Sequence, residues 1–167
     1  MFTGSFRHSL DSAGRFVMPK RFRYSLGQEF IITKGLGCLC VFPTDFVNKT
    51  LAPGLEALGS GLEALLNPDI VRLTRHYFSN MEITRGDNQN RVPLTPEHRR
   101  YAGIEDEVVI CGCGNYIEIW SPQALQEYEE QNDRVEDLIA SGAALRSRMN
   151  SQASTEQNAG VSSAGTS

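Results

Sequence analysis

The fold is decided by a stretch that occurs twice, first as FRHSLDSAGRFVMPKRFRYSLG at residues 6–27 and again as EITRGDNQNRVPLTPEHRRYAG at residues 82–103. The second copy lies 76 positions after the first. Four positions carry the same residue in both copies: Asp11 and Asp87, Arg15 and Arg91, Arg23 and Arg99, and Gly27 and Gly103. A repeat of this kind indicates that one supersecondary unit is present twice in the chain.

Each copy predicts a tight turn within its Asp-x-x-x-Arg segment. Gly14 and Asn90 stand at the same position, directly before the arginine. Glycine and asparagine most readily adopt the positive φ that closes a type I turn with a left-handed residue. Asp11 and Asp87 can accept hydrogen bonds from backbone N–H groups two residues further on. We therefore expect a hairpin in each copy, with the aspartate and the arginine at its base close enough to pair.

The segments that follow the two turns also correspond. With two inserted residues, FII at 30–32 aligns with VVI at 108–110. Helix starts are then expected at Thr44 and at Ser121, where Pro122 supplies the first helical residue. The sequence of each half predicts the same elements in the same order: a strand, a turn, a strand, a short helix, a strand, a turn, a strand and a helix. A half of about 45 residues can hardly bury a core alone, so we expect the halves to interlock into one barrel-like α+β unit.

The repeat also predicts the domain organisation. Asn67 and Pro68 are typical of a helix cap and first turn, which places a helix in the linker. The C-terminal residues are rich in Ser, Ala, Gly and Gln and lack aromatic residues, as is typical of disordered tails. In chain order we expect a first repeat at 5–49, a linker with a helix at 50–79, a second repeat at 80–123, a C-terminal helix at 124–150 and a disordered tail at 151–167.

The formal net charge of −4 conceals a strong asymmetry along the chain. Residues 1–24 contain five basic residues and one acid, whereas residues 102–141 contain ten acids and one base. Charge asymmetry of this kind suggests that one face attracts polyanions. The basic segment coincides with the first turn and the short helix after it.

Several classes of protein are disfavoured by the sequence. No apolar run is long enough for a transmembrane helix, and residues 1–8 lack the apolar core of a secretory signal, so we expect a cytoplasmic protein without a membrane partner. No common nucleophile, zinc-protease or phosphate-binding motif occurs, and His8, His76 and His98 are scattered. We therefore expect neither an enzyme nor a cofactor.

The four cysteines form two C-x-C pairs, Cys38 with Cys40 and Cys111 with Cys113. A zinc site is conceivable, but structural zinc sites more often have two or more residues between paired cysteines. Both pairs lie in segments that resemble strands, where residues i and i+2 share a face. We prefer the interpretation that they are small buried residues, without a metal.

The chain resembles the MraZ family of bacterial transcriptional regulators. The resemblance rests on the start of the chain, both Asp-x-x-x-Arg turns and their flanks: residues 1–4, 7–11, 14–15, 19–22, 87, 91, 99–103 and 114–120. It implies an AbrB-like swapped-hairpin fold, similar to a double-psi β-barrel, with two copies fused in one chain. It also implies a ring-shaped homo-oligomer, an octamer or dodecamer, that is associated with the nucleoid. Such a protein represses its own cell-division and cell-wall gene cluster by binding short direct repeats in promoter DNA.

The two turns are the candidate DNA-binding sites. Arginine can bind guanine or phosphate, and its alternative role here is to stiffen the turn by pairing with the aspartate. The predicted DNA-binding residues are Arg15 and Arg91 in the turns and Arg7, Lys20, Arg21 and Arg23 around the first turn. Asp11, Gly14, Asp87 and Asn90 are predicted to shape the turns and orient the arginines. The alternative function is that of an AbrB-like antitoxin or protein-interaction module.

Overall fold

The computed structural model describes residues 1–58, 61–132 and 137–147. Met1–Leu125 form one compact unit, and the described residues from Gln126 onward belong to a second. The strands are β1 (Phe2–Ser9), β2 (Arg15–Val17), β3 (Glu29–Lys34), β4 (Leu39–Pro43), β5 (Glu82–Arg85), β6 (Arg91–Pro93), β7 (Glu107–Gly114) and β8 (Ile117–Trp120). The helices are α1 (Lys20–Leu26), α2 (Thr44–Phe46), the π-helical segment η1 (Val47–Leu51), α3 (Ala52–Glu56), α4 (Gly61–Leu66), α5 (Pro68–Phe78), α6 (Pro96–Ala102) and α7 (Pro122–Asn132).

The order of these elements confirms the predicted repeat and the α+β class. β1, β2, α1, β3 and β4 of the first half reappear as β5, β6, α6, β7 and β8 of the second half. The predicted tail at 151–167 lies outside the described residues, as do 133–136 and 148–150 of the predicted C-terminal helix. Residues 137–147 are helical. Among the described residues, no helix is long and apolar enough to cross a membrane.

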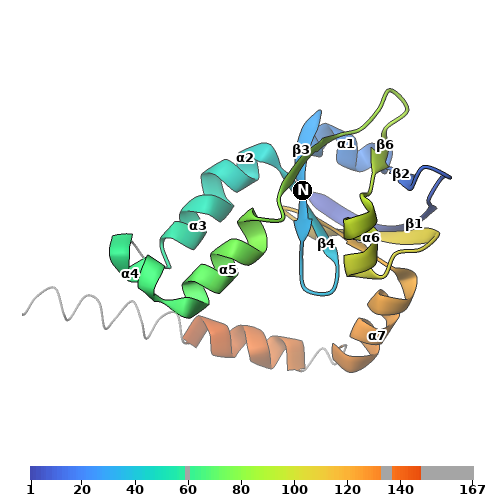
Figure 1. Ribbon diagram of the computed structural model, residues 1–167. Helices are drawn as coiled ribbons and strands as arrows, with labels where there is room; N and C mark the ends of the chain where they lie inside the picture. Colours follow the sequence, from blue (N-terminus) through green and yellow to red (C-terminus); the bar gives the residue numbers. More distant parts are fainter. Residues whose placement is uncertain (59–60, 133–136, 148–167) are drawn as a thin grey trace, which may run out of the picture. The chain divides into compact units, whose positions relative to one another are not determined.

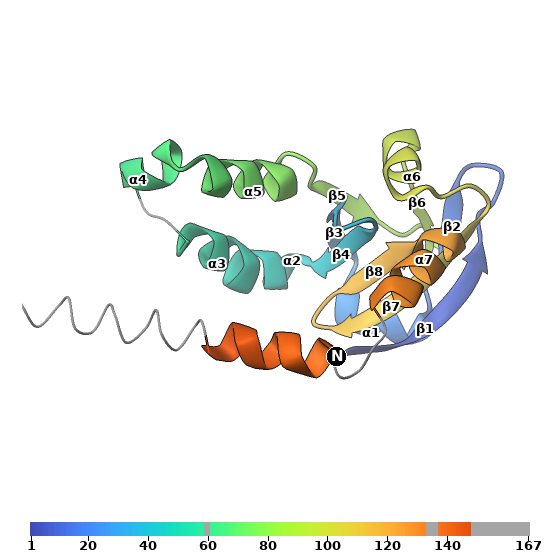
Figure 2. The same ribbon diagram turned by 90° about the horizontal axis from the view of Figure 1, so that it is seen from below.

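Six strands form one antiparallel sheet in the order β1-β7-β8-β4-β3-β5, and Figure 2 labels all six of them. Figure 1 shows the same structure from a second direction. The first half supplies β1, β4 and β3, which pair with β7, β8 and β5 of the second half. Because β1 corresponds to β5, β7 to β3 and β8 to β4, the strand order is the same from either edge. The two halves are therefore interlocked about a pseudo-twofold axis, in an open sheet rather than a closed barrel.

The remaining two strands form a separate antiparallel ribbon. β2 pairs with β6, with Phe16 opposite Val92 at the centre. The strands on either side of each turn, β1 with β2 and β5 with β6, are not paired in the sheets. Each turn forms as predicted, with a backbone bond from the aspartate N–H to the arginine carbonyl at 2.8 Å in the first turn and 3.0 Å in the second. Its second strand then pairs with its counterpart from the other repeat, as the swapped-hairpin resemblance implies, and not with the strand before the turn. Burial explains the exchange, because pairing β2 with β6 brings the fully buried Phe16 and Val92 together in one core.

Both faces of the six-stranded sheet are covered. Alternate residues of β3 face opposite ways, so Ile32 belongs to one core and Ile31 to the other. The first core includes residues of the β2–β6 ribbon, α1 and α6. The second includes Phe42 of β4, Trp120 of β8 and residues of η1 and α7. The ribbon is therefore fixed to the sheet by the first core.

The cysteines mostly belong to the second core. Cys38 and Cys40 are buried there, which confirms the interpretation that they are small buried residues. Cys111 packs against the same cluster, but Cys111 and Cys113 are only half-buried, so the interpretation holds for the first pair alone. In the part of the chain that the structure describes, no group of three or more His, Cys, Asp or Glu residues is arranged to hold a metal ion.

The linker between the repeats is helical over most of its length and extends away from the sheet (Figure 1). Asn67 caps α5 by accepting hydrogen bonds from the N–H groups of Asp69 and Ile70, as predicted. α2, η1 and α3 form one uninterrupted helical run that contains Pro53. The π-helical turn of η1 ends two residues before Pro53 and covers the position four residues before it, where an α-helical carbonyl would clash with the proline ring.

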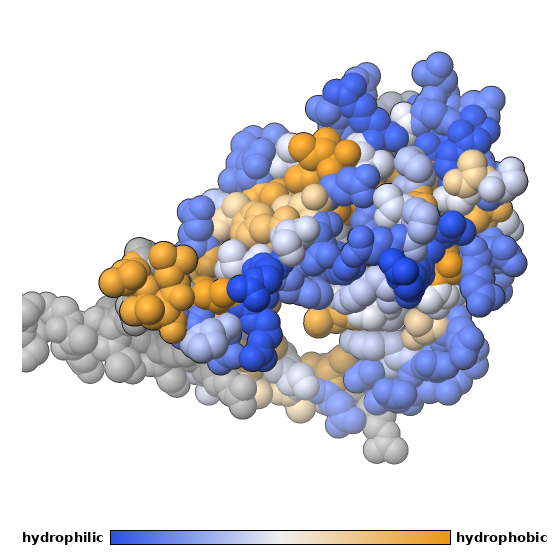
Figure 3. Space-filling model, in the orientation of Figure 1, coloured by the Kyte–Doolittle hydropathy of each residue, from blue (hydrophilic) through white to orange (hydrophobic). Residues whose placement is uncertain are grey.

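Apolar side chains lie exposed at the far end of this linker. Leu62, Leu65 and Leu66 of α4 are all more than two-thirds exposed. Figure 3 shows a hydrophobic patch at this end of the linker. An apolar patch of this kind on a protein surface is typical of an interaction site.

Candidate nucleic-acid interface

The two Asp-x-x-x-Arg turns lie next to each other because the strands that follow them form the β2–β6 ribbon. In that ribbon Arg15 lies opposite Pro93, and Arg91 lies opposite Val17. Strand alternation directs Phe16 and Val92 into the core and leaves the neighbouring arginines on the outer side. One chain therefore presents two arginine turns as a single unit.

Both turns have the same internal geometry. In the first, Asp11 Oδ1 accepts hydrogen bonds from the backbone N–H groups of Ala13 and Arg15, each at 3.0 Å. In the second, Asp87 Oδ1 accepts from the N–H groups of Gln89 and Arg91, each at 2.9 Å. In each turn one carboxylate oxygen therefore holds two backbone N–H groups.

The residue before each arginine has the predicted left-handed backbone. Gly14 has a φ of 72°, and Asn90 has a φ of 61°. Asn90 is the one residue other than glycine with a positive φ in the described part of the chain. A backbone hydrogen bond closes each turn. In the first, the Gly14 N–H donates to the Asp11 carbonyl at 2.9 Å, and in the second the Asn90 N–H donates to the Asp87 carbonyl at 2.7 Å.

The aspartates also hold the arginine side chains. Asp11 Oδ2 lies 2.9 Å from both Nε and Nη2 of Arg15. Asp87 Oδ2 accepts a hydrogen bond from Arg91 Nε at 2.7 Å and lies 3.6 Å from Arg15 Nη1. The four side chains thus form one cluster that joins both repeats, each about one-third exposed.

The cluster is not symmetric, although the repeats are. Arg15 is held by carboxylates of both turns, through three of its nitrogens. Arg91 is held by Asp87 of its own turn, and within the described chain it forms no ion pair with Asp11. Arg91 is therefore freer than Arg15 to bind an added ligand. The sequence did not indicate this difference between the two turns.

The electrostatics of the cluster favour charged aspartates. The side-chain hydrogen bond from Arg15 lowers the pKa of Asp11, and its turn N–H groups act in the same direction. The backbone N–H of Arg91 is the largest cause that lowers the pKa of Asp87, followed by the Arg91 side chain. Both carboxylates stay ionised at neutral pH and so hold the arginines in place.

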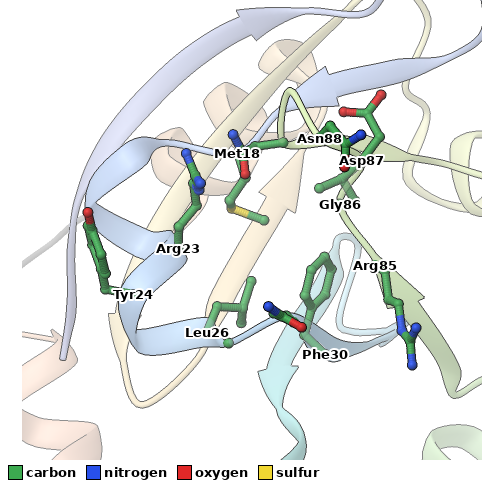
Figure 4. Close-up of a pocket in the computed structure, with 13 residues that line it drawn as sticks. Met18, Arg23, Tyr24, Leu26, Phe30, Arg85, Gly86, Asp87 and Asn88 are labelled. Carbon is green, nitrogen blue, oxygen red and sulfur yellow. The ribbon is translucent and has the colours of Figure 1, made fainter.

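The other predicted residues lie outside this cluster. Arg7, on β1, forms an ion pair with Glu107 of β7 at 3.4 Å. Lys20 is exposed at the start of α1, and Arg21 lies over the Phe6 ring, 5.8 Å from its centre. Arg23 lines a cavity of about 560 Å³ together with Asn88 and Asn90 of the second turn (Figure 4).

One basic residue near the turns was not among the predicted site residues. The guanidinium of Arg99, on α6 of the second repeat, packs against Gly14 of the first turn. A β-carbon at position 14 would lie 3.3 Å from Arg99 Cζ. The repeat alignment pairs Arg99 with Arg23, a predicted DNA-binding residue, so the sequence did contain a signal for Arg99. The contact itself depends on the exchange of strands between halves.

The chemistry available to this surface is recognition of anions by arginine. The side chains of Arg15 and Arg91 are about one-third exposed, and a guanidinium can bind phosphate or the edge of guanine with two parallel hydrogen bonds. Two such arginines on adjacent turns suit a ligand that carries several anionic groups.

A family model and the related sequences of known proteins point to the same family. The family model described as "MraZ protein, putative antitoxin-like" matches residues 1–49 and 78–146. A relative from Heliobacterium modesticaldum, named transcriptional regulator MraZ, is 40% identical over 133 residues, which cover 78% of this chain and 88% of the relative. Relatives with the same name from Carboxydothermus hydrogenoformans and Natranaerobius thermophilus are 39% and 36% identical, over 83% and 84% of this chain and 99% and 94% of their own lengths.

Proposed function

Because this chain belongs to the MraZ family of transcriptional regulators, we propose that it binds promoter DNA through its two Asp-x-x-x-Arg turns. The observation that carries the proposal is the four-residue cluster of Asp11, Arg15, Asp87 and Arg91, which presents two arginines from adjacent turns on one outer surface. The relatives are named as regulators and not as enzymes.

In this proposal the arginines of the turns make the main contacts to the DNA. Arg15 and Arg91 bind guanine edges or phosphates, and the aspartates orient them without touching the phosphates, which they would repel. The basic residues around the first turn position the protein on the backbone: Arg7, Lys20, Arg21 and Arg23. Arg91 pairs with one carboxylate, whereas Arg15 pairs with two, and this supports direct contact by the second turn as well as the first.

We further propose that the protein is a repressor that assembles into a ring. Several subunits would engage successive short direct repeats upstream of a cell-division and cell-wall cluster that includes its own gene. Individually modest contacts would then multiply through effective concentration. The exposed leucines of α4 support a surface that needs a partner. The protein would act in the cytoplasm, on the nucleoid.

A mobility-shift titration with the DNA upstream of its own gene tests the proposal. Arg15→Ala and Arg91→Ala should each weaken binding by about 5- to 150-fold, because one bidentate base contact contributes about 1–3 kcal/mol. Arg72→Ala is the matched control, since Arg72 lies on α5 with an 80% exposed side chain and carries the same charge. Equal binding by all four proteins would refute the assignment of the turns.

The second candidate function is a protein-interaction or antitoxin module. It is favoured by the family's antitoxin-like description and by the apolar surface of α4. Failure of the wild-type protein to shift any upstream fragment at low salt would favour this candidate. Light scattering would separately test the ring, because a monomer would remove the basis for multivalent binding.

A further inference from the structure

The first turn is covered by a side chain from the other repeat. Arg99 extends from α6, and its Cζ and Nε would lie 3.3 and 3.4 Å from a β-carbon at Gly14. The backbone fixes this approach, because the Leu94 N–H donates to the Gly14 carbonyl at 3.1 Å. Arg99 is therefore held beside the turn that carries Arg15.

The charge of Arg99 is not balanced within the described chain. Its Nε is buried and has no hydrogen-bond partner, and no carboxylate of the described residues lies within ion-pair distance of its guanidinium. Arg7, Arg15, Arg85 and Arg91 each have such a carboxylate. Arginine stays protonated in proteins, and an unpaired cation with a buried nitrogen is costly. An anion is the partner that would offset this cost.

The second turn has a related neighbour at the equivalent position. Arg23 is the counterpart of Arg99 at the repeat offset of 76, as Gly14 is of Asn90. Arg23 extends from α1 of the first repeat and shares a cavity with Asn88 and Asn90 of the second turn. Each turn is thus accompanied by a helix arginine of the opposite repeat.

We propose that Arg99 is a phosphate ligand and that each DNA contact is composite, with a turn arginine from one repeat and a helix arginine from the other. This inference rests on the proposed function. Phosphate is the matching chemistry because a guanidinium can bind two of its oxygens in parallel. A substitution in the second repeat then weakens the contact made by the first turn.

The test measures the DNA affinity of Arg99→Gln across a series of salt concentrations. We expect affinity to fall by about 10- to 100-fold, as for loss of a charged hydrogen bond. The slope of log affinity against log salt should become shallower by about 0.9 for each phosphate that the variant no longer binds. Arg99→Lys keeps the positive charge and should keep the wild-type slope. Arg72→Gln, an equal loss of charge on remote α5, should leave both quantities unchanged.

The outcomes separate this inference from the proposed function. If wild-type protein does not bind upstream DNA, the proposed function fails. If it binds and Arg99→Gln retains the wild-type affinity and salt slope, the composite contact is refuted while the proposed function stands. A salt slope for Arg99→Lys as low as that of Arg99→Gln would also overturn the phosphate role, because a structural defect alone would then account for the loss.

Discussion

Gly14→Ala tests the geometry of the first turn directly. Gly14 has a φ of 72°, where a side chain crowds the following carbonyl at a cost of about 1–2 kcal/mol. The new methyl group would also lie 3.3 Å from Arg99 Cζ and 3.6 Å from the Leu94 carbonyl oxygen. We expect the free energy of unfolding to fall by about 1–2 kcal/mol. In urea, with a slope of about 2 kcal/mol per molar, the midpoint should fall by roughly 0.5–1 M.

The repeat supplies the control for this experiment. Asn90 occupies the equivalent position with a φ of 61°, so a β-carbon is already present there in the wild-type protein. Asn90→Ala should therefore destabilise less than Gly14→Ala, when both are measured at one protein concentration. Equal losses at both positions, or none at position 14, would refute the argument that the backbone of Gly14 sets the cost.

Three further predictions concern the centre of the ribbon, a helix cap in the linker and a buried histidine. Phe16→Ala removes a fully buried ring at the centre of the β2–β6 ribbon and should lower the free energy of unfolding by about 3–5 kcal/mol, measured by urea unfolding. Asn67→Ala removes the cap of α5 and should cost about 0.5–2 kcal/mol in the same assay, whereas Asn67→Asp should keep most of the stability. Burial lowers the pKa of His98 below its ordinary 6.5, so the unfolded chain takes up a proton that the folded chain resists. Stability should therefore fall as the pH drops through 6.5, and His98→Gln should lose this part of the pH dependence in urea titrations.

The local features of the fold were predictable because their causes are local. Gly14 and Asn90 mark the turns by their backbone preference, and Asn67 with Pro68 marks the start of α5. The repeat then gives the order of the elements. The helical run through Pro53 was not predicted, because a proline ordinarily interrupts a helix and here a π-helical turn precedes it.

The pairing of the elements was not predictable in the same way. A turn sequence defines its own backbone but does not specify which strand its exit strand will join. The partner of β2 is chosen by the shared burial of Phe16 and Val92. For the same reason, the link from Arg15 to Asp87 and the approach of Arg99 to Gly14 had no signature in local spacing.

The interlocked sheet has a consequence for synthesis on the ribosome. β1 is made first, yet its partner is β7, and the contacting residues Ser5 and Cys111 are 106 positions apart. At about 5–20 residues per second, β1 emerges roughly 5–20 s before its partner exists. During that interval the nascent chain carries an unpaired strand edge, the kind of segment that chaperones shield. Because the two repeats are fused in one chain, the partner strand is always made, but only after the residues between β1 and β7 have been translated.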